Sequence, residues 1–200
     1  MTTGIAMPDP AAIVNAGYRF DPATIGVALT DGVGEIELAS VFDTQAWSLA
    51  SRTLAVTTDG GPVRSRHGLT FLPRADLASA APQLDRLLVP GSAAAAAPGI
   101  PASGGLEPEY VHDRPGFAFD ATVADLARST DVATARWAAK VLELPTDGLV
   151  LDGPAWPWVP TLTIAALMLP GAGIAAVVLR RRRGAHHEPV DGARPLVRTP

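Results

Sequence analysis

One long apolar segment of the chain limits its architecture more than any other sequence feature. Residues 159–179 form a run of 21 residues without a charge. A helix of this length extends for about 31 Å, close to the roughly 30 Å hydrocarbon core of a bilayer. Trp156 and Trp158 precede the run, and four arginines at 180–183 follow it. This arrangement is typical of an aromatic belt and a stop-transfer anchor. We therefore predict a single transmembrane helix over 156–179.

The alternative for this segment is a buried pair of short helices interrupted at Pro170 and Gly171. These residues loosen a helix, although membrane spans tolerate them. A soluble core helix has no use for four consecutive arginines at its end, so the sequence favours the span. The expected location is therefore the cell membrane, crossed once.

The charge distribution predicts an orientation. Residues 180–200 carry six arginines and two acidic residues, which gives this tail a charge of +4. The net charge of the whole chain is −4, so the remaining residues carry −8. Basic tails stay in the cytoplasm, which places the body outside. The first residues lack the basic and apolar regions of a signal peptide, so we expect an export signal upstream in a longer protein. An acidic body also argues against nucleic acid as a partner.

The chain contains no cysteine. This excludes disulfides, zinc–thiolate sites and cysteine nucleophiles from these 200 residues. No cofactor and no metal site are predicted. Adjacent histidines at 186 and 187 diverge on a helix, so we interpret them as part of a solvated tail rather than as metal ligands.

Alternating apolar segments indicate an α/β domain. A β-branched run at 24–29 is followed by a turn and by an amphipathic helix over 35–51. A second strand at 53–57 completes a βαβ unit, which implies parallel strands. A ribbon at 62–73, a short helix around 76–80 and a strand at 85–89 follow, and two helices cover roughly 120–128 and 131–143. The pattern predicts a partial doubly wound, flavodoxin-like parallel sheet.

The same pattern divides the chain into successive regions. We expect a lead-in at 1–23, an α/β half domain at 24–91, a low-complexity loop at 92–116, a helical pair at 117–150, the transmembrane helix at 156–179 and a basic tail at 180–200.

Three stretches together resemble a known family. They are IGVALTDGVGEIELASVFD, LAVTTDGGPVRSRHGLTFLPRADL and LDRLLVPG, and the later FDATVADLARSTDVATARWAAKVLELP agrees with them. Their order is similar to that of the ThiJ/PfpI family of the class I glutamine amidotransferase-like superfamily. More narrowly, the chain resembles the C-terminal half of actinobacterial membrane-anchored members.

The resemblance implies two landmarks of a functional site. One is a glutamate after the first strand, matched here by Glu37 with Glu35 as its close rival. The competing interpretation is that both glutamates only stabilise the start of the helix, where the helix dipole favours negative charge. The other landmark is a cysteine elbow after the strand that follows the Val-Pro-Gly turn. The sequence predicts that alanines, prolines and glycines replace this elbow, so the family's thiolate chemistry is not expected.

Other candidate residues have structural alternatives. His112 lies between Tyr110 and Asp113 in a loop, which suits a general base. Ser92 and Ser103 lack a nucleophile elbow. His67 follows two nearby arginines and suits either an anion site or a polar surface ribbon. The helices at 119–143 faintly resemble a helix-turn-helix, but they carry few basic residues.

We therefore expect a membrane-anchored, degenerate ThiJ/PfpI-like domain that is non-catalytic and acts as a structural or interaction module. Its partner is a related domain or a second copy, paired at a sheet edge left exposed by missing strands. One alternative is a cysteine-independent hydrolase or lyase that uses Glu37 and His112. Another is a ligand-sensing module that signals through the span.

Overall fold

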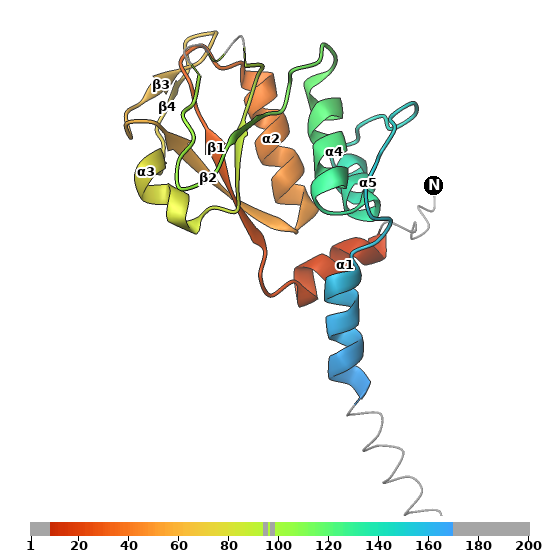
Figure 1. The fold of residues 1–200 in the computed structure, drawn as a ribbon. Coiled ribbons are helices and arrows are strands. Elements are labelled where there is room, and N and C mark those ends of the chain that lie inside the picture. Colours follow the sequence, from red (N-terminus) through yellow and green to blue (C-terminus); the bar gives the residue numbers. More distant parts are fainter. Residues whose placement is uncertain (1–8, 94–95, 97–98, 170–200) are drawn as a thin grey trace, which may run out of the picture. The chain divides into compact units, whose positions relative to one another are not determined.

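The computed structural model describes residues 9–93, 96 and 99–169 (Figure 1). Contacts between residues divide the chain into two units, with the boundary after Thr161. The first unit holds the whole α/β domain.

The domain is built on a five-stranded parallel sheet with the strand order β5-β2-β1-β6-β7. The strands are β1 (Ala23–Ala28), β2 (Ser51–Thr57), β5 (Ala75–Asp76), β6 (Arg86–Val89) and β7 (Pro108–Tyr110). A separate antiparallel ribbon pairs β3 (Val63–Arg64) with β4 (Thr70–Phe71). The structure thus confirms the predicted α/β class and parallel sheet.

Helices cover both faces of this sheet, as Figure 1 shows. They are α1 (Asp9–Tyr18), α2 (Glu35–Ser48), α3 (Leu77–Ala80), α4 (Ala118–Ser129) and α5 (Val132–Val141), with a 3-10 turn at Ala81–Gln83. Helix α2 ends where Leu49 adopts a left-handed conformation and donates its N–H to the Ala46 carbonyl, a common C-terminal cap. The ranges predicted for α2, α3, α4 and α5 all overlap the observed helices.

Alternation along the strands creates two apolar layers. Ile25 and Val27 of β1 pack with Leu38 and Val41 of α2 on one face. On the other face, Leu87 and Val89 of β6 pack with Leu77 and Ala80 of α3. Ala96 and Ile100 from the loop after β6 join the same layer. The small-residue stretch after β6 therefore contributes to the core.

Gly26 of β1 marks a close approach within the second layer. A Cβ built at this position would lie 2.5 Å from Leu84 Cδ1. The absence of a side chain lets Leu84 pack directly on the strand, which is a recurrent use of glycine within strands.

Two elements lie where the sequence predicts none. Helix α1 falls within the predicted lead-in 1–23, and β7 falls within the predicted loop 92–116. Strand β7 pairs in parallel with β6, so β6 is not an edge strand. The sheet ends instead in two very short strands, β5 and β7, which limit edge-to-edge pairing.

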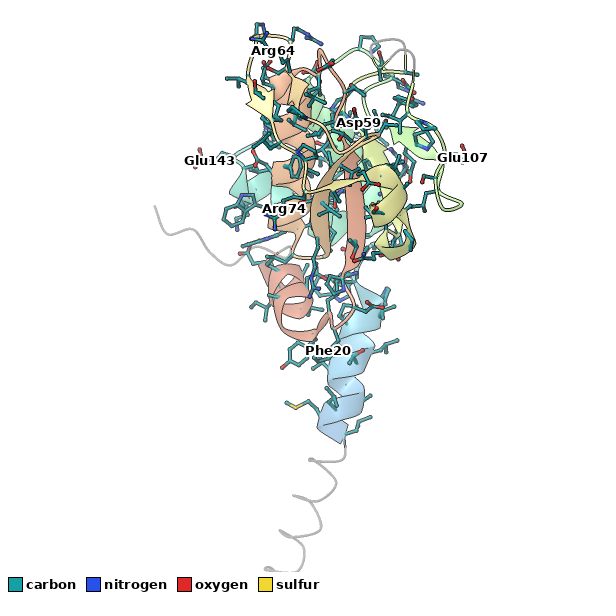
Figure 2. The ribbon with its side chains drawn as sticks, turned by 90° about the vertical axis from the view of Figure 1, so that its left-hand side faces the viewer. Phe20, Asp59, Arg64, Arg74, Glu107 and Glu143 are labelled. Atoms are coloured by element: carbon teal, nitrogen blue, oxygen red, sulfur yellow. The ribbon has the colours of Figure 1, made fainter. Side chains whose placement is uncertain are left out.

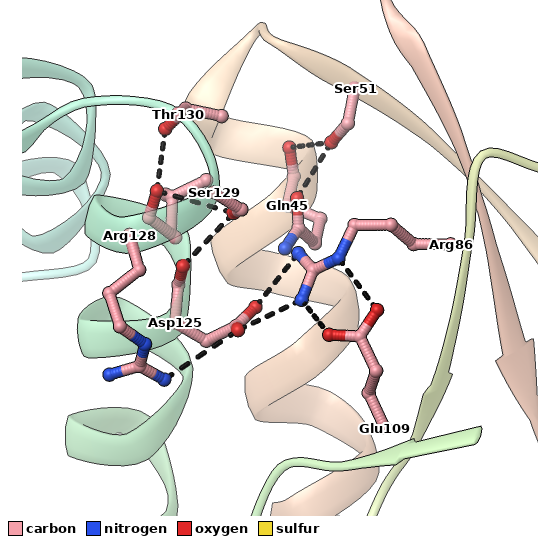
Figure 3. Close-up of polar contacts among 9 residues, drawn as sticks. Gln45, Ser51, Arg86, Glu109, Asp125, Arg128, Ser129 and Thr130 are labelled. Atoms are coloured by element: carbon pink, nitrogen blue, oxygen red, sulfur yellow. Dashed lines mark hydrogen bonds and ion pairs between the residues drawn. The ribbon is translucent and has the colours of Figure 1, made fainter. Parts of the chain in front are cut away.

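An ion network holds β6, β7 and α4 together (Figure 3). The Arg86 guanidinium donates through Nε to Glu109 Oε1 at 3.0 Å and through Nη2 to Asp125 Oδ1 at 2.9 Å. Burial lowers the pKa of Arg86, but the hydrogen bonds that it donates to Glu109 and Asp125, and the charges of these two residues, outweigh burial and raise the pKa. The charge pairs therefore link β7 to the helix that covers it.

Residues 158–169 are helical. Within the described part of the chain, no helix combines the length and hydrophobicity that a membrane crossing requires. Residues 170–179 of the predicted span, and the basic tail at 180–200, lie outside the described residues.

Candidate functional site

The strand order reverses between β1 and β6, and three loops meet there at the carboxyl ends of the strands. The chain leaves β1 toward β2 on one side, while β6 and β7 extend the sheet on the other. In open α/β sheets, ligands bind at such a switch point. Glu37 lies in the first turn of α2 and His112 lies two residues after β7, so both predicted site residues belong to this edge.

The His112 imidazole is hydrogen-bonded at both ring nitrogens. Gly91 donates its backbone N–H to Nδ1 at 2.9 Å, and Nε2 lies 3.1 Å from Ser40 Oγ. Ser40 in turn donates its hydroxyl to the Glu37 carbonyl at 2.8 Å. Because Nδ1 accepts a hydrogen bond from the Gly91 N–H, the neutral ring carries its proton on Nε2 and donates a hydrogen bond to Ser40 Oγ. The lone pair that a general base requires is therefore already engaged.

Burial lowers the pKa of His112, and the nearby Glu37 carboxylate and a backbone hydrogen bond with Ala118 oppose this shift only in part. The neutral form is thus favoured in the folded domain. Protonation would place a hydrogen on Nδ1, directly against the Gly91 N–H. The hydrogen bonds and the pKa agree on a neutral imidazole.

The Glu37 carboxylate is bound to a residue other than His112. It forms an ion pair with Arg66 of the ribbon loop, with Oε1 and Nη2 3.5 Å apart. It also folds back against Gly34, where a built Cβ would lie 2.0 Å from Oε2. The structure brings Glu37 and His112 into electrostatic range, but it directs the carboxylate toward the ribbon.

Glu35, the rival carboxylate, is held by the ribbon loop more firmly still. Its Oε2 lies 2.6 Å from His67 Nδ1, and its Oε1 accepts the His67 backbone N–H at 2.9 Å. Hydrogen bonds from Ser65 and then from His67 lower the pKa of Glu35 to about 2. His67 is therefore a partner of Glu35, and the two glutamates fasten the ribbon to the start of α2.

The strand that follows the Val-Pro-Gly turn is β7, and His112 lies two residues after it. The neighbouring Asp113 accepts the Ala93 N–H through Oδ1 at 3.0 Å. The alanine-rich stretch lies earlier, between β6 and β7. The short sequence from Tyr110 to Asp113, ahead of a helix, is the signal that could have located the end of this strand.

Ser103 and the helical pair α4 and α5 have structural roles. Ser103 forms an isolated bridge with Leu106, and α4 and α5 bury Leu126 and Ala135 against each other, which is the packing of a scaffold. His186 and His187 lie outside the described residues. In the described ranges, no group of three or more potential metal ligands is found.

Two hollows flank this edge of the sheet. An apolar one of about 300 Å³ lies between α2 and β4, lined in part by Phe42, Phe71 and Leu72. A larger one of about 630 Å³ has a mixed polar lining between the loop after β7 and the outer face of α4, including Arg114, Phe117 and Asp120. Both have the size of small-molecule pockets.

Comparison with known proteins places these observations beside solved structures. No family model and no curated protein matches the chain. A DJ-1 superfamily protein from Agrobacterium tumefaciens is 28% identical over 34% of this chain and 37% of its own, with a TM-score of 0.31. Drosophila melanogaster DJ-1beta is 13% identical over 62% of this chain and 100% of its own, with a TM-score of 0.47. Oxidized DJ-1 from Toxoplasma gondii is 12% identical over 61% of this chain and 98% of its own, with a TM-score of 0.47.

All three of these neighbours are described as DJ-1 proteins or as a DJ-1 superfamily protein, and the likeness to them concerns the fold alone.

Proposed function

We propose that the chain is a membrane-anchored, non-catalytic interaction module with a DJ-1/ThiJ-like fold. The observation that carries this proposal is the hydrogen bonding of His112, whose two ring nitrogens are engaged by Gly91 and Ser40. His112 thus braces the crevice from within. The absence of cysteine from these 200 residues supports the same conclusion.

The helix at 158–169 supports the anchor. Six of its large apolar side chains are 60% or more exposed, namely Trp158, Val159, Leu162, Leu167, Met168 and Leu169. Such a surface is costly in water. The uncharged sequence continues to Leu179 and is followed by four arginines, so lipid is the environment that suits this segment.

The non-catalytic proposal is tested by carbethoxylation of the full chain with diethyl pyrocarbonate, which attacks neutral imidazole at a free lone pair. His67 is the internal control, because its side chain is 76% exposed and its Nε2 faces away from the Glu35 bond. We expect His67 to react and His112 to resist, as measured by peptide mass spectrometry. Equal rates at both residues would show an open site and favour the hydrolase or lyase that uses Glu37 and His112.

Anchoring and orientation are tested by introducing single cysteines into the cysteine-free chain. Glu107→Cys places a thiol on the exposed loop of the body (Figure 2), and Ala193→Cys places one in the tail. With a membrane-impermeant maleimide on intact cells, we expect labelling at position 107 only. Labelling at position 193 only would reverse the orientation. Recovery of the chain in the soluble fraction would contradict the anchor.

A ligand-sensing module is the second candidate, and the hollow of about 630 Å³ beside α4 favours it. Small organic acids should then raise the unfolding temperature of the full chain, and Arg114→Ala should abolish the shift. Identical shifts in both proteins would exclude this hollow as the site.

A further inference from the structure

Helix α1 turns an apolar stripe outward. Ile13, Ala16 and Gly17 lie on one side of the helix at spacings of three and four residues from Ile13, and Phe20 follows two residues after the helix ends. We call these four exposed residues the α1 stripe. Ile13 is 69% exposed and Phe20 is 72% exposed. A Cβ built on Gly17 would meet open space. An ordinary surface helix carries polar residues on this side, so the exposed stripe needs a separate explanation.

The opposite side of α1 fixes the helix in this orientation. Asn15 is 2% exposed and donates its amide to Thr134 Oγ1 at 2.8 Å and to the Ser48 carbonyl at 3.2 Å. Rolling the helix to bury Ile13 would break both bonds and leave buried polar groups unsatisfied, which proteins avoid. The outward position of the stripe is therefore built into the fold.

The chain segment that precedes Trp158 attaches at the same end of the domain as α1. Asn15 of α1 binds the first turn of α5 through Thr134, and Val132 at the start of α5 donates its N–H to the Pro154 carbonyl at 2.8 Å. The α1 stripe and the segment before Trp158 thus attach to one helix end. Tryptophan is the residue enriched where a membrane helix leaves the hydrocarbon core.

The stripe lies at the end of the sheet away from the crevice. Strand β1 begins five residues after α1 and runs from α1 toward the loops that hold His112 and Glu35. Its six residues span about 20 Å. In Figure 2, Phe20 and Arg64 mark these opposite ends of the domain.

We propose that the α1 stripe rests in the boundary between lipid headgroups and acyl chains, and that it orients the domain with its crevice facing away from the bilayer. This inference rests on the anchor in the proposed function. A lipid surface is favoured over a protein partner by size, because two large side chains offer far less than the roughly 800 Å² a side of a stable protein interface. An anchored domain needs little intrinsic affinity, since the anchor itself supplies a high local lipid concentration.

The test uses the full chain, reconstituted into vesicles of phosphatidylcholine and phosphatidylglycerol in which the phosphatidylcholine is brominated. Four single-cysteine variants carry an environment-sensitive fluorophore: Ile13→Cys, Phe20→Cys, Leu167→Cys and Ile36→Cys. Ile36 is the matched control, because it is also a large apolar residue, 59% exposed, but lies in the first turn of α2 at the crevice end.

We expect brominated lipid to quench the labels at positions 13, 20 and 167 by roughly twofold, as for apolar groups buried in the interface, and to leave position 36 unchanged. Quenching at 167 alone would overturn this inference and leave the anchor intact. No quenching at 167 would overturn the anchor and this inference together. A blue-shifted but unquenched label at position 20 would show that protein, not lipid, covers the stripe, and would also overturn the inference.

Discussion

At the carboxyl ends of the strands, polar groups that could act on a ligand are bound to other parts of the domain, whereas at the amino ends apolar side chains are left exposed. His112 is held by Gly91 and Ser40, and Glu35 is held by His67. At the other end, Ile13 and Phe20 extend outward from α1.

The contrast shows which surface is available to something outside the domain. A polar group already hydrogen-bonded within the protein gains little by exchanging that partner for a ligand. An exposed apolar side chain gains from any surface that removes it from water. The polar side chains at the end of the sheet where ligands usually bind are thus already engaged within the domain, whereas the apolar stripe at the amino end can still gain from a partner.

Ion pairs of Arg86 hold β6, β7 and α4 together at the amino end of the sheet. Breaking them gives the largest change in stability that we predict. Arg86→Met leaves Glu109 and Asp125 without their shared cation, and the Arg86 and Asp125 side chains are mostly buried. We expect a loss of about 3 kcal/mol in the free energy of unfolding, measured by urea denaturation of the full chain in detergent. Arg128→Met removes an exposed partner of Asp125 at 3.7 Å, and it should cost less than about 0.5 kcal/mol. Equal losses would contradict the importance of the Arg86 network.

The second prediction separates the two sides of α1. Asn15→Ala should lower the free energy of unfolding by about 2 kcal/mol, because Thr134 and the Ser48 carbonyl lose a buried partner. Ile13→Ser should change it by less than about 0.5 kcal/mol, as for exposed positions in general. The same urea titration compares the two variants. A larger loss for Ile13→Ser would mean that the stripe belongs to the core of the domain.

A third prediction concerns pH at the crevice end. Because folding lowers the pKa of His112 below 6.5, the unfolded chain binds more protons in that range, so stability falls as the pH drops from 6.5 through the folded pKa. Glu37 is the charged group that opposes this shift. His112→Leu should remove this part of the pH dependence and cost about 1 kcal/mol at pH 8, since Gly91 loses its acceptor.

The control for this pH dependence is His67→Gln, measured through urea midpoints between pH 8 and 5. It should retain the loss of stability that His112 causes. If both variants keep the full dependence, another group is responsible and the internal bracing of the crevice by His112 is not supported.

The smallest effect is expected at the bond between the ribbon and α2. The pKa of Glu35 falls from 4.5 to about 2 on folding, so its contribution is fully present above pH 4.5 and is lost as the pH falls toward 2. Glu35→Gln should therefore lower the urea midpoint slightly at pH 5 and converge with the native chain near pH 2. The control is a substitution of an exposed glutamate, Glu107→Gln. Its urea midpoint should not move toward that of the native chain as the pH falls. A constant offset for Glu35→Gln would contradict the ionic origin of this bond.

Most of the central fold was predictable because its elements have strong local patterns. The predicted strand at 24–29 and helix at 35–51 overlap β1 and α2, where β-branched runs and spaced apolar residues give clear periodicity. Strands β2 and β6 were found for the same reason. The two glutamates singled out from the sequence lie in the first turn of α2.

The missed elements lack such patterns. Helix α1 buries Asn15 and exposes Ile13, so its polarity is reversed and no ordinary amphipathic signal arises. Strand β7 has only three residues, beginning with Pro108, and forms because β6 offers it a pairing edge. The position of His112 at the carboxyl ends of the strands could not be predicted without locating β7.

The sequence by itself determined the α/β class, the order of most elements and the hydrophobic character of residues 159–179, because periodicity and uncharged length are properties of neighbouring residues. Only the tertiary structure decided that the Gly91 N–H engages His112, that Arg66 and His67 engage the two glutamates, and that α1 faces outward. Each of these outcomes depends on which backbone donors, charges and buried partners meet across long sequence separations, and local patterns do not contain that information.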